Sequence, residues 1–348
     1  MAAVERSAHA VRLQRRRLLT RAAFFALFVL APPLDLFRLD LTRGHFILLG
    51  LDWTLGLDAF LAGTIGPLEA AGNLVLRGFL PIALGVGAFF WIARRYGRLY
   101  CGWLCPHFSV VEVINGLLRR AIGRPTVWER VAAPQRRPDG TLEPRGPLWW
   151  LVALPAIAAF SFLWAVVLLT YLLPPAEVYG NLVDGTLTRN QATFLTAATL
   201  AFVVEFTLAR HLFCRYGCAV GLFQSYVWMF NRRGMVVGYD RTRSDACASC
   251  NDACEHACPM RLKPRASKRH VFSCTQCTRC IQACSEVQRD NPQGSLLSWV
   301  RESCAEDAAW TGFGPRPVCA DPNCHLQHDS GERIVTLERK RRDAGGQG

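Results

Sequence analysis

The amino-acid sequence predicts an α-helical membrane protein with four transmembrane helices, followed by a small cysteine-rich α+β domain on the cytoplasmic side. The 348-residue chain is 51% hydrophobic and has a positive mean hydropathy of +0.15. Its apolar residues are concentrated in four blocks, and the chain becomes polar after Asp240. These observations divide it into a membrane domain over residues 1–239, a compact domain over residues 240–300, and a partly disordered cytoplasmic tail over residues 301–348.

The four apolar blocks are the candidates for membrane-spanning helices, which need about 20 predominantly apolar residues. They cover residues 18–36, 78–92, 148–173 and 192–213. Pro32, Pro33 and Asp35 interrupt the end of the first block, and the second block is short unless its flanks are included. No small-residue cleavage site follows the first block, so we expect a transmembrane helix there rather than a secretory signal peptide.

The net charge of +13 comes from arginines that are distributed unevenly between the blocks. Ten arginines lie between the second and third blocks, whereas only Arg189 lies between the third and fourth. Another group stands at the start of the first block: Arg12, Arg15, Arg16, Arg17 and Arg21. Arginine-rich loops remain in the cytoplasm, so the pattern predicts a multi-pass protein of the bacterial inner membrane with both termini in the cytoplasm. Topology thus accounts for the positive charge, and no nucleic-acid partner is expected.

Eight of the fifteen cysteines fall in two motifs of the compact domain. "CASCNDACEHACP" holds Cys247, Cys250, Cys254 and Cys258, and "CTQCTRCIQAC" holds Cys274, Cys277, Cys280 and Cys284. In two-cluster ferredoxins, three closely spaced cysteines hold one cubane and the fourth ligand comes from the other motif. The order therefore predicts two [4Fe–4S] clusters, one on Cys247, Cys250, Cys254 and Cys284, the other on Cys274, Cys277, Cys280 and Cys258.

Two zinc sites are the alternative, because paired C-x-x-C motifs also bind zinc. The pattern departs from the bacterial ferredoxin motif in two places. Three residues separate Cys250 from Cys254, and Ser285 stands where a proline would follow the last cysteine. Neither departure removes a ligand, and eight cysteines in the ferredoxin order favour cubanes.

Two further cysteine pairs lie just after the second and fourth blocks, Cys101 and Cys105 in "YCGWLCP" and Cys214 and Cys218 in "CRYGC". In the predicted topology both pairs lie at the cytoplasmic face of the membrane. The four thiols, here called the membrane-face thiols, are candidate ligands of a third metal centre, either iron–sulfur or copper. A dithiol redox relay and simple packing between helices are the alternatives. After the first pair, "FSVVEVINGLLRR" predicts an amphipathic helix lying on the membrane surface.

These motifs resemble a known family, the membrane polyferredoxins of the CcoG, RdxA and FixG type. The resemblance is carried by "YCGWLCP", "CRYGCAVGLFQS", "MVVGYDRTRSDAC" and "CIQACSEVQRDNPQGSLLSWV". It implies a role beside cbb-type cytochrome oxidases, in reducing copper for oxidase assembly. More loosely, the sequence is similar to NapH and NosR-like membrane ferredoxins, which pass quinol-derived electrons to respiratory enzymes. No further apolar block follows Ser285, an architecture closer to NapH.

The predicted function is that of a membrane-bound iron–sulfur protein that relays single electrons. The electrons would pass between the membrane, where quinone or copper takes part, and a cytoplasmic, respiratory or oxidase-assembly partner. One alternative is a NapH-like component that oxidises quinol. Another is a membrane-bound redox sensor or assembly factor without turnover. Enzymatic activity, as a cupric reductase or quinol dehydrogenase, is left undecided.

A few remaining features bear on this function. Glu205 lies within the fourth block and is a candidate for handling quinol protons, or else an interfacial group paired with Arg210 or His211. His107 and His211 flank the membrane-face thiols. Cys304, Cys319 and Cys324 fit no ligand spacing and receive no role. The sequence lacks a C-x-x-C-H motif and a glycine-rich dinucleotide fingerprint, so covalent haem and direct oxidation of NADH are not expected.

Overall fold

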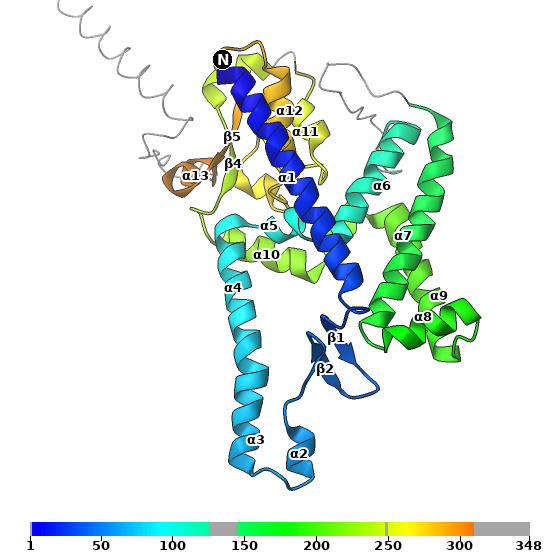
Figure 1. The fold of residues 1–348 in the computed structure, drawn as a ribbon. Helices are drawn as coiled ribbons and strands as arrows, with labels where there is room; N and C mark the ends of the chain where they lie inside the picture. The colour runs from blue at the N-terminus through cyan, green and yellow to red at the C-terminus, as the bar shows by residue number, and fades with distance from the viewer. Residues whose placement is uncertain (1, 125–127, 129–144, 248–249, 310–348) are drawn as a thin grey trace, which may run out of the picture.

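The computed structural model describes residues 2–124, 128, 145–247 and 250–309, with the backbone alone for residues 2–10. In this part of the chain the protein is mostly helical. Figure 1 shows a cysteine-rich domain at one end, three groups of helices extending from it, and a small sheet near the other end. The tail after residue 309, including Cys319, Cys324 and the predicted disorder, lies outside the described residues.

The membrane domain is built mainly from helices. Its elements are α1 Ala2–Leu30, α2 Leu57–Leu61, α3 Pro67–Asn73, the π-helix η1 Leu74–Phe79, α4 Leu80–Tyr96, α5 Leu99–Trp103, α6 Pro106–Ile122, η2 Pro147–Trp149, α7 Trp150–Thr170, α8 Pro175–Asp184, α9 Arg189–Val204, the π-helices η3 Glu205–Ala209 and η4 Phe213–Gly217, and α10 Ala219–Met229.

Three helices of the described chain are long and apolar enough to cross a membrane, namely Pro67–Tyr96, Pro147–Thr170 and Arg189–Ala209. They contain or overlap the second, third and fourth apolar blocks. The first block begins within α1, which is not among these three: several arginines lie in this helix, and it ends at Leu30, before Pro32 and Pro33. The fourth transmembrane helix therefore stays a prediction.

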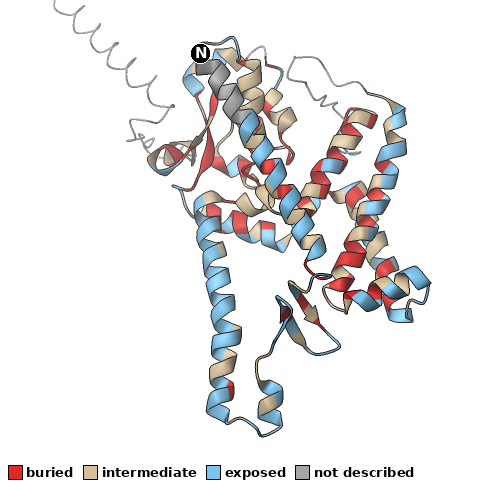
Figure 2. Cartoon of the chain, viewed as in Figure 1, coloured by how far each residue is buried: buried red, intermediate tan, exposed pale blue. Residues whose placement is uncertain are grey.

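The longest of the three helices stands apart from the others. In the apolar part of Pro67–Tyr96 no residue is buried within the protein, and Figure 2 shows α4 almost entirely in the colour of exposed residues. Large apolar side chains such as Ile82, Leu84 and Trp91 are more than half exposed. This surface suits contact with lipid. The end of α4 nearest Tyr96 packs against α5 and α10 (Figure 1).

The segment after α1 forms a three-stranded antiparallel sheet, with β1 at Phe37–Asp40, β2 at His45–Leu48 and β3 at Leu51–Trp53. It is attached to the far end of α7 by backbone hydrogen bonds from Leu39 N to Tyr171 O (2.9 Å) and from Leu41 N to Leu172 O (3.0 Å). The sheet lies near the ends of α1 and α7 that are remote from the cysteine-rich domain (Figure 1).

Helix α6 does not lie on a membrane surface, so that prediction was wrong. Its apolar residues Phe108, Val111 and Ile114 are buried in the core, and its polar residues Glu112 and Asn115 are buried as well. The helix packs between α1 and α7. The amphipathic pattern is real, but the polar side faces charged groups of the protein instead of lipid headgroups.

The cysteine-rich domain contains β4 Val236–Tyr239, η5 Arg241–Cys247, α11 Ala253–Ala257, η6 Lys268–Val271, α12 Arg279–Val287, β5 Leu297–Val300 and α13 Glu302–Ala309. Strand β4 precedes the predicted boundary at residue 240, yet it pairs antiparallel with β5, from Val236 opposite Val300 to Tyr239 opposite Leu297. Helices α11 and α12 pack together, and α1 contacts α12. Cys304 is buried in α13.

Candidate functional site

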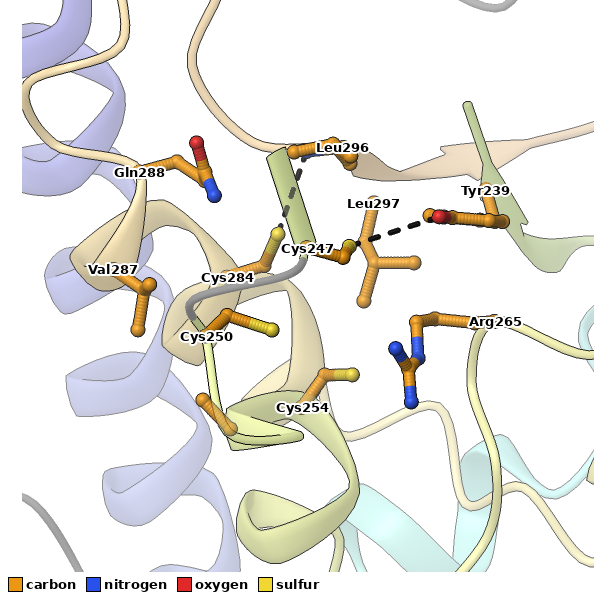
Figure 3. Close-up of a pocket in the computed structure, with 11 residues that line it drawn as sticks. Tyr239, Cys247, Cys250, Cys254, Arg265, Cys284, Val287, Gln288, Leu296 and Leu297 are labelled. Carbon is orange, nitrogen blue, oxygen red and sulfur yellow. Dashed lines mark hydrogen bonds between the residues drawn. The ribbon is translucent and has the colours of Figure 1, made fainter. Parts of the chain in front are cut away.

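Four cysteines of the compact domain surround a first pocket of about 300 Å³, open solvent at its mouth included. They are Cys247, Cys250, Cys254 and Cys284, the same four that the order of the motifs groups together. Figure 3 shows their sulfur atoms turned toward a common space. Cys284 reaches this group because α12 packs against α11, which carries Cys254.

Hydrogen-bond donors approach the thiols of the first pocket (Figure 3). The Tyr239 hydroxyl donates to Cys247 Sγ at 3.6 Å, and the Leu296 backbone N–H donates to Cys284 Sγ at 3.4 Å. Arg265 also lines the pocket and forms ion pairs with Asp252 and Glu255. Donors and a cation around clustered thiols suit thiolate ligands of an anionic cluster.

The second pocket, of about 370 Å³ with open solvent included, is lined by the other four cysteines, Cys258, Cys274, Cys277 and Cys280. The Leu262 backbone N–H donates to Cys258 Sγ at 3.4 Å. Thr275 lines the same pocket, and its buried hydroxyl has no hydrogen-bond partner within the described chain. A buried hydroxyl without an acceptor is unusual, and sulfur of a bound cluster would supply one.

Both pockets disfavour free thiolates. Burial raises the pKa of Cys254 to about 12 and that of Cys258 to about 11, because an anion loses its hydration there, and neighbouring thiols oppose ionisation further. Thiolates in these pockets therefore need a compensating cation. Iron bound to the four sulfurs would provide that compensation, and binding would release protons.

The structure also brings the membrane-face thiols together. Cys101 lies on α5 and Cys214 on η4, and Cys105 and Cys218 are the N-cap residues of α6 and α10. Thiols of the two pairs are close enough to interact electrostatically. In addition, Gln224 on α10, beyond the second pair, donates from Nε2 to Cys101 Sγ of the first pair at 3.3 Å. The two motifs, more than 100 residues apart in sequence, thus form one site.

The second pocket is packed directly on the membrane-face motif. A Cβ atom added to Gly102 would lie 1.8 Å from the Thr275 carbonyl oxygen, so only glycine allows this approach of the two backbones. Trp103 Nε1 donates to the Gln276 carbonyl at 3.1 Å, and Gln14 Nε2 donates to the Cys277 carbonyl at 2.8 Å. The second cysteine motif is therefore held by α1 and α5.

A buried ionic cluster also holds the second cysteine motif against the membrane domain. Glu112 of α6 pairs with Arg17 at 2.7 Å, with Arg21, and with Arg279 of α12 at 3.4 Å. Arg17 also donates from Nε to the Gly102 carbonyl at 2.7 Å. Three arginines around one carboxylate leave the region beside the second pocket positively charged.

Glu205 pairs with a different residue than expected. Its Oε1 lies 3.1 Å from His107 Nε2, and Trp164 Nε1 donates to His107 Nδ1 at 3.2 Å. Glu205 Oε2 is buried without a hydrogen-bond partner among the described residues. The pair links η3 to the start of α6, next to the membrane-face thiols.

Several residues that shape these sites were not predicted from the sequence. They are Arg98, Gly102 and Glu112. Gly102 had a signal, because glycine between two candidate ligands indicates close approach of another backbone. Arg98 and Glu112 looked like ordinary charged residues near a membrane surface, and nothing in the local sequence distinguishes them.

The comparisons with known proteins support iron–sulfur chemistry. A family model described as a 4Fe-4S binding domain matches residues 78–125 and 191–234. These two segments hold the membrane-face thiols, and the eight cysteines of the compact domain lie outside them. The match covers the helices that lead into each thiol pair and the helices that follow.

The relatives point to electron transfer. YccM of Escherichia coli, whose name gives it as a candidate electron transport protein, is 23% identical over 65% of this chain and 57% of its own length. The ferredoxin-type protein NapH of Haemophilus influenzae is 26% identical over 63% of this chain and 72% of its own length. No solved structure matches. The chain thus carries a 4Fe-4S domain and is distantly related to iron–sulfur electron-transfer proteins; a closer relation to the CcoG, RdxA and FixG type is not confirmed.

Proposed function

We propose that this protein is a membrane-bound relay that carries single electrons between the bilayer and a cytoplasmic or respiratory partner. The observation that carries the proposal is the arrangement of eight cysteines around two pockets, each pocket combining three cysteines of one motif with the last cysteine of the other. Clusters of the [4Fe–4S] type, when bound there, supply one-electron chemistry at potentials that range from roughly −700 to +450 mV.

The geometry favours clusters over single zinc ions. Each pocket takes three cysteines from one motif and the last cysteine of the other. This is the ligand order of two-cluster ferredoxins.

The membrane-face thiols are proposed to hold a third [4Fe–4S] cluster. The family match to a 4Fe-4S binding domain falls on the two segments that contain them, and four thiols that interact electrostatically form a complete ligand set. A copper site or a dithiol relay at the same place are the alternatives.

Quinol is the proposed source or acceptor of electrons in the membrane. Quinol oxidation releases protons as well as electrons, and ionisable side chains within membrane helices often take part in proton transfer. Glu205 is such a side chain, at the end of a candidate membrane helix, with one buried carboxylate oxygen free of hydrogen bonds in the described chain. It begins a π-helix, a distortion frequent at functional sites.

The proposed location is the bacterial inner membrane, with four transmembrane helices and both termini in the cytoplasm. The uneven distribution of arginines supports this orientation. The start of α1 and the cysteine-rich domain also lie at the same end of the molecule (Figure 1), as an orientation with both in the cytoplasm requires.

The test is the iron and acid-labile sulfide content of anaerobically purified protein, measured again with all four membrane-face thiols changed to serine. Three cubanes predict about 12 irons per chain, falling to about eight in the variant. About eight irons in both samples would contradict the third cluster, and zinc in place of iron would contradict the proposal as a whole.

A second measurement separates a relay from a sensor. Under anaerobic conditions, a water-soluble quinol is added to the oxidised protein and cluster reduction is followed by electron paramagnetic resonance. A relay becomes reduced and is reoxidised by an added one-electron acceptor. A protein that quinol does not reduce, but that passes electrons from a chemical reductant to Cu(II), would favour the copper alternative. Reduction without reoxidation would favour the sensor.

A further inference from the structure

Arg98 is a fully buried cation between two of the thiol sites. The residue precedes α5 and is 1% exposed. Its Nη1 donates to the Cys214 carbonyl at 2.6 Å, and its Nε donates to the Ser225 hydroxyl at 2.5 Å. The guanidinium lies 5.9 Å from the centre of the Phe272 ring, just before the second cysteine motif. Arg98 thus connects the segment that carries Cys101 and Cys105 with the segment that carries Cys214 and Cys218, and it lies beside the compact domain.

The guanidinium faces thiols from both sites. It interacts electrostatically with Cys101, Cys214 and Cys218 of the membrane-face group and also with Cys274 of the second pocket. In the described part of the chain, Nη2 of Arg98 is buried without a hydrogen-bond partner, and no carboxylate there forms an ion pair with it. A buried charge without a counter-ion is strongly destabilising, so this arrangement calls for an anion.

We propose that Arg98 is the shared counter-charge of the membrane-face centre and of the cluster in the second pocket. A cubane with four thiolate ligands is anionic, and its sulfur would be an acceptor for the unpartnered Nη2. This inference rests on the proposed function, because it requires metal at both sites. It adds a named residue that raises the reduction potentials of two centres together.

The position of Arg98 has a consequence for electron transfer between the two sites. One electron leaves one centre and enters the other, and no proton or bond changes. The total negative charge around Arg98 is therefore the same before and after the step. A single fixed cation lowers the free energy of adding an electron to either centre, and it does not need to move during the transfer.

The first pocket offers an internal contrast. Its arginine, Arg265, is engaged by two carboxylates, Asp252 and Glu255, so much of its charge is already compensated. We expect Arg98 to influence the second pocket and the membrane-face centre, and to leave the first pocket unchanged because it has no part in that site.

The test compares Arg98→Gln, Arg98→Lys and the control Arg265→Gln in the full chain. Iron is counted first, and the midpoint potential of each centre is then determined by titration followed with electron paramagnetic resonance. For Arg98→Gln we expect at least a tenfold lower ratio of reduced to oxidised form at a fixed potential in both centres, which corresponds to about 59 mV for a one-electron couple. Lysine should restore most of this shift, and Arg265→Gln should affect the first pocket alone.

The possible outcomes separate the two proposals. If wild-type protein holds about eight irons, the membrane-face centre is absent and both the third cluster and the shared role of Arg98 are wrong. If the iron count is about 12 and Arg98→Gln changes neither potential, or changes only one, the role of Arg98 alone is wrong. If Arg98→Gln does not assemble, Ser225→Asp places a carboxylate beside Nε and should lower both potentials; unchanged potentials there would contradict the proposal.

Discussion

Each of the two pockets combines three cysteines of one motif with the last cysteine of the other, but the pockets differ in the residues that surround them. The first pocket is supported by elements of the compact domain, with donors from Tyr239 and Leu296. The loop of the second pocket is packed against the membrane domain, through Gly102, Trp103 and Gln14. A repeated cysteine motif therefore produced two sites with different neighbours. The loop of the second pocket contacts the segment that carries Cys101 and Cys105.

The two pockets also differ in the charged groups beside them. Beside the second pocket, three arginines share one carboxylate, Glu112, and Arg98 is buried nearby. Beside the first pocket, one arginine faces two carboxylates. Since positive charge raises a cluster's potential, we expect the second cluster to be the more easily reduced if the clusters are otherwise alike.

The largest effect is expected from Gly102→Ala. The new Cβ would collide with the Thr275 carbonyl at 1.8 Å, so the second motif must move away from α5. We expect loss of the second cluster with the first retained, which lowers the iron count by about four. The matched control is Gly116→Ala on α6, where a Cβ meets no atom within 4 Å. Equal iron counts in both variants would show that the close approach does not matter.

Removing the carboxylate of the ionic cluster should be the next most damaging change. Glu112→Gln leaves Arg17, Arg21 and Arg279 without their shared counter-charge, and breaking a buried ion pair costs about 3–5 kcal/mol. Thermal unfolding should therefore begin at a clearly lower temperature. Glu306→Gln serves as the control, because it removes a partly buried partner of the exposed Arg233, and loss of a surface ion pair should change the unfolding temperature little.

A smaller effect is expected where one hydrogen bond holds the second motif. Trp103→Phe keeps an aromatic ring but removes the donor to the Gln276 carbonyl, a loss of about 1 kcal/mol. The second cluster should then be lost faster on exposure to an iron chelator, while the first is lost at the wild-type rate. A uniform acceleration of both would mean that the contact supports the whole domain instead.

The smallest change tests the first pocket. Tyr239→Phe removes the hydroxyl that donates to Cys247 Sγ. Because hydrogen bonds to cluster sulfurs raise the potential, the first cluster should become slightly harder to reduce, and the second should not change. A redox titration that follows the signal of each cluster measures the two potentials. A shift in the potential of the second cluster would contradict the prediction that Tyr239 acts on the first pocket alone.

Local patterns were sufficient for part of the architecture. The three apolar stretches that form candidate membrane helices were recognisable from length and composition alone. The grouping of Cys258 with the second motif and of Cys284 with the first followed from their order, and the structure brings the same groups together. Helix α6 was misjudged, because an amphipathic pattern does not say whether its polar side meets water, lipid headgroups or buried arginines.

The sequence by itself determined which thiols line each pocket, because the spacing of cysteines within a motif limits which thiols a short loop can bring together. The tertiary structure alone decided how the sites are joined. Arg98 reaches Cys214 across 116 positions of the chain, and Trp103 reaches Gln276 across 173. Such contacts depend on how whole helices pack, and no local pattern encodes them. The same packing made Gly102 one of the contacts between the membrane domain and the compact domain.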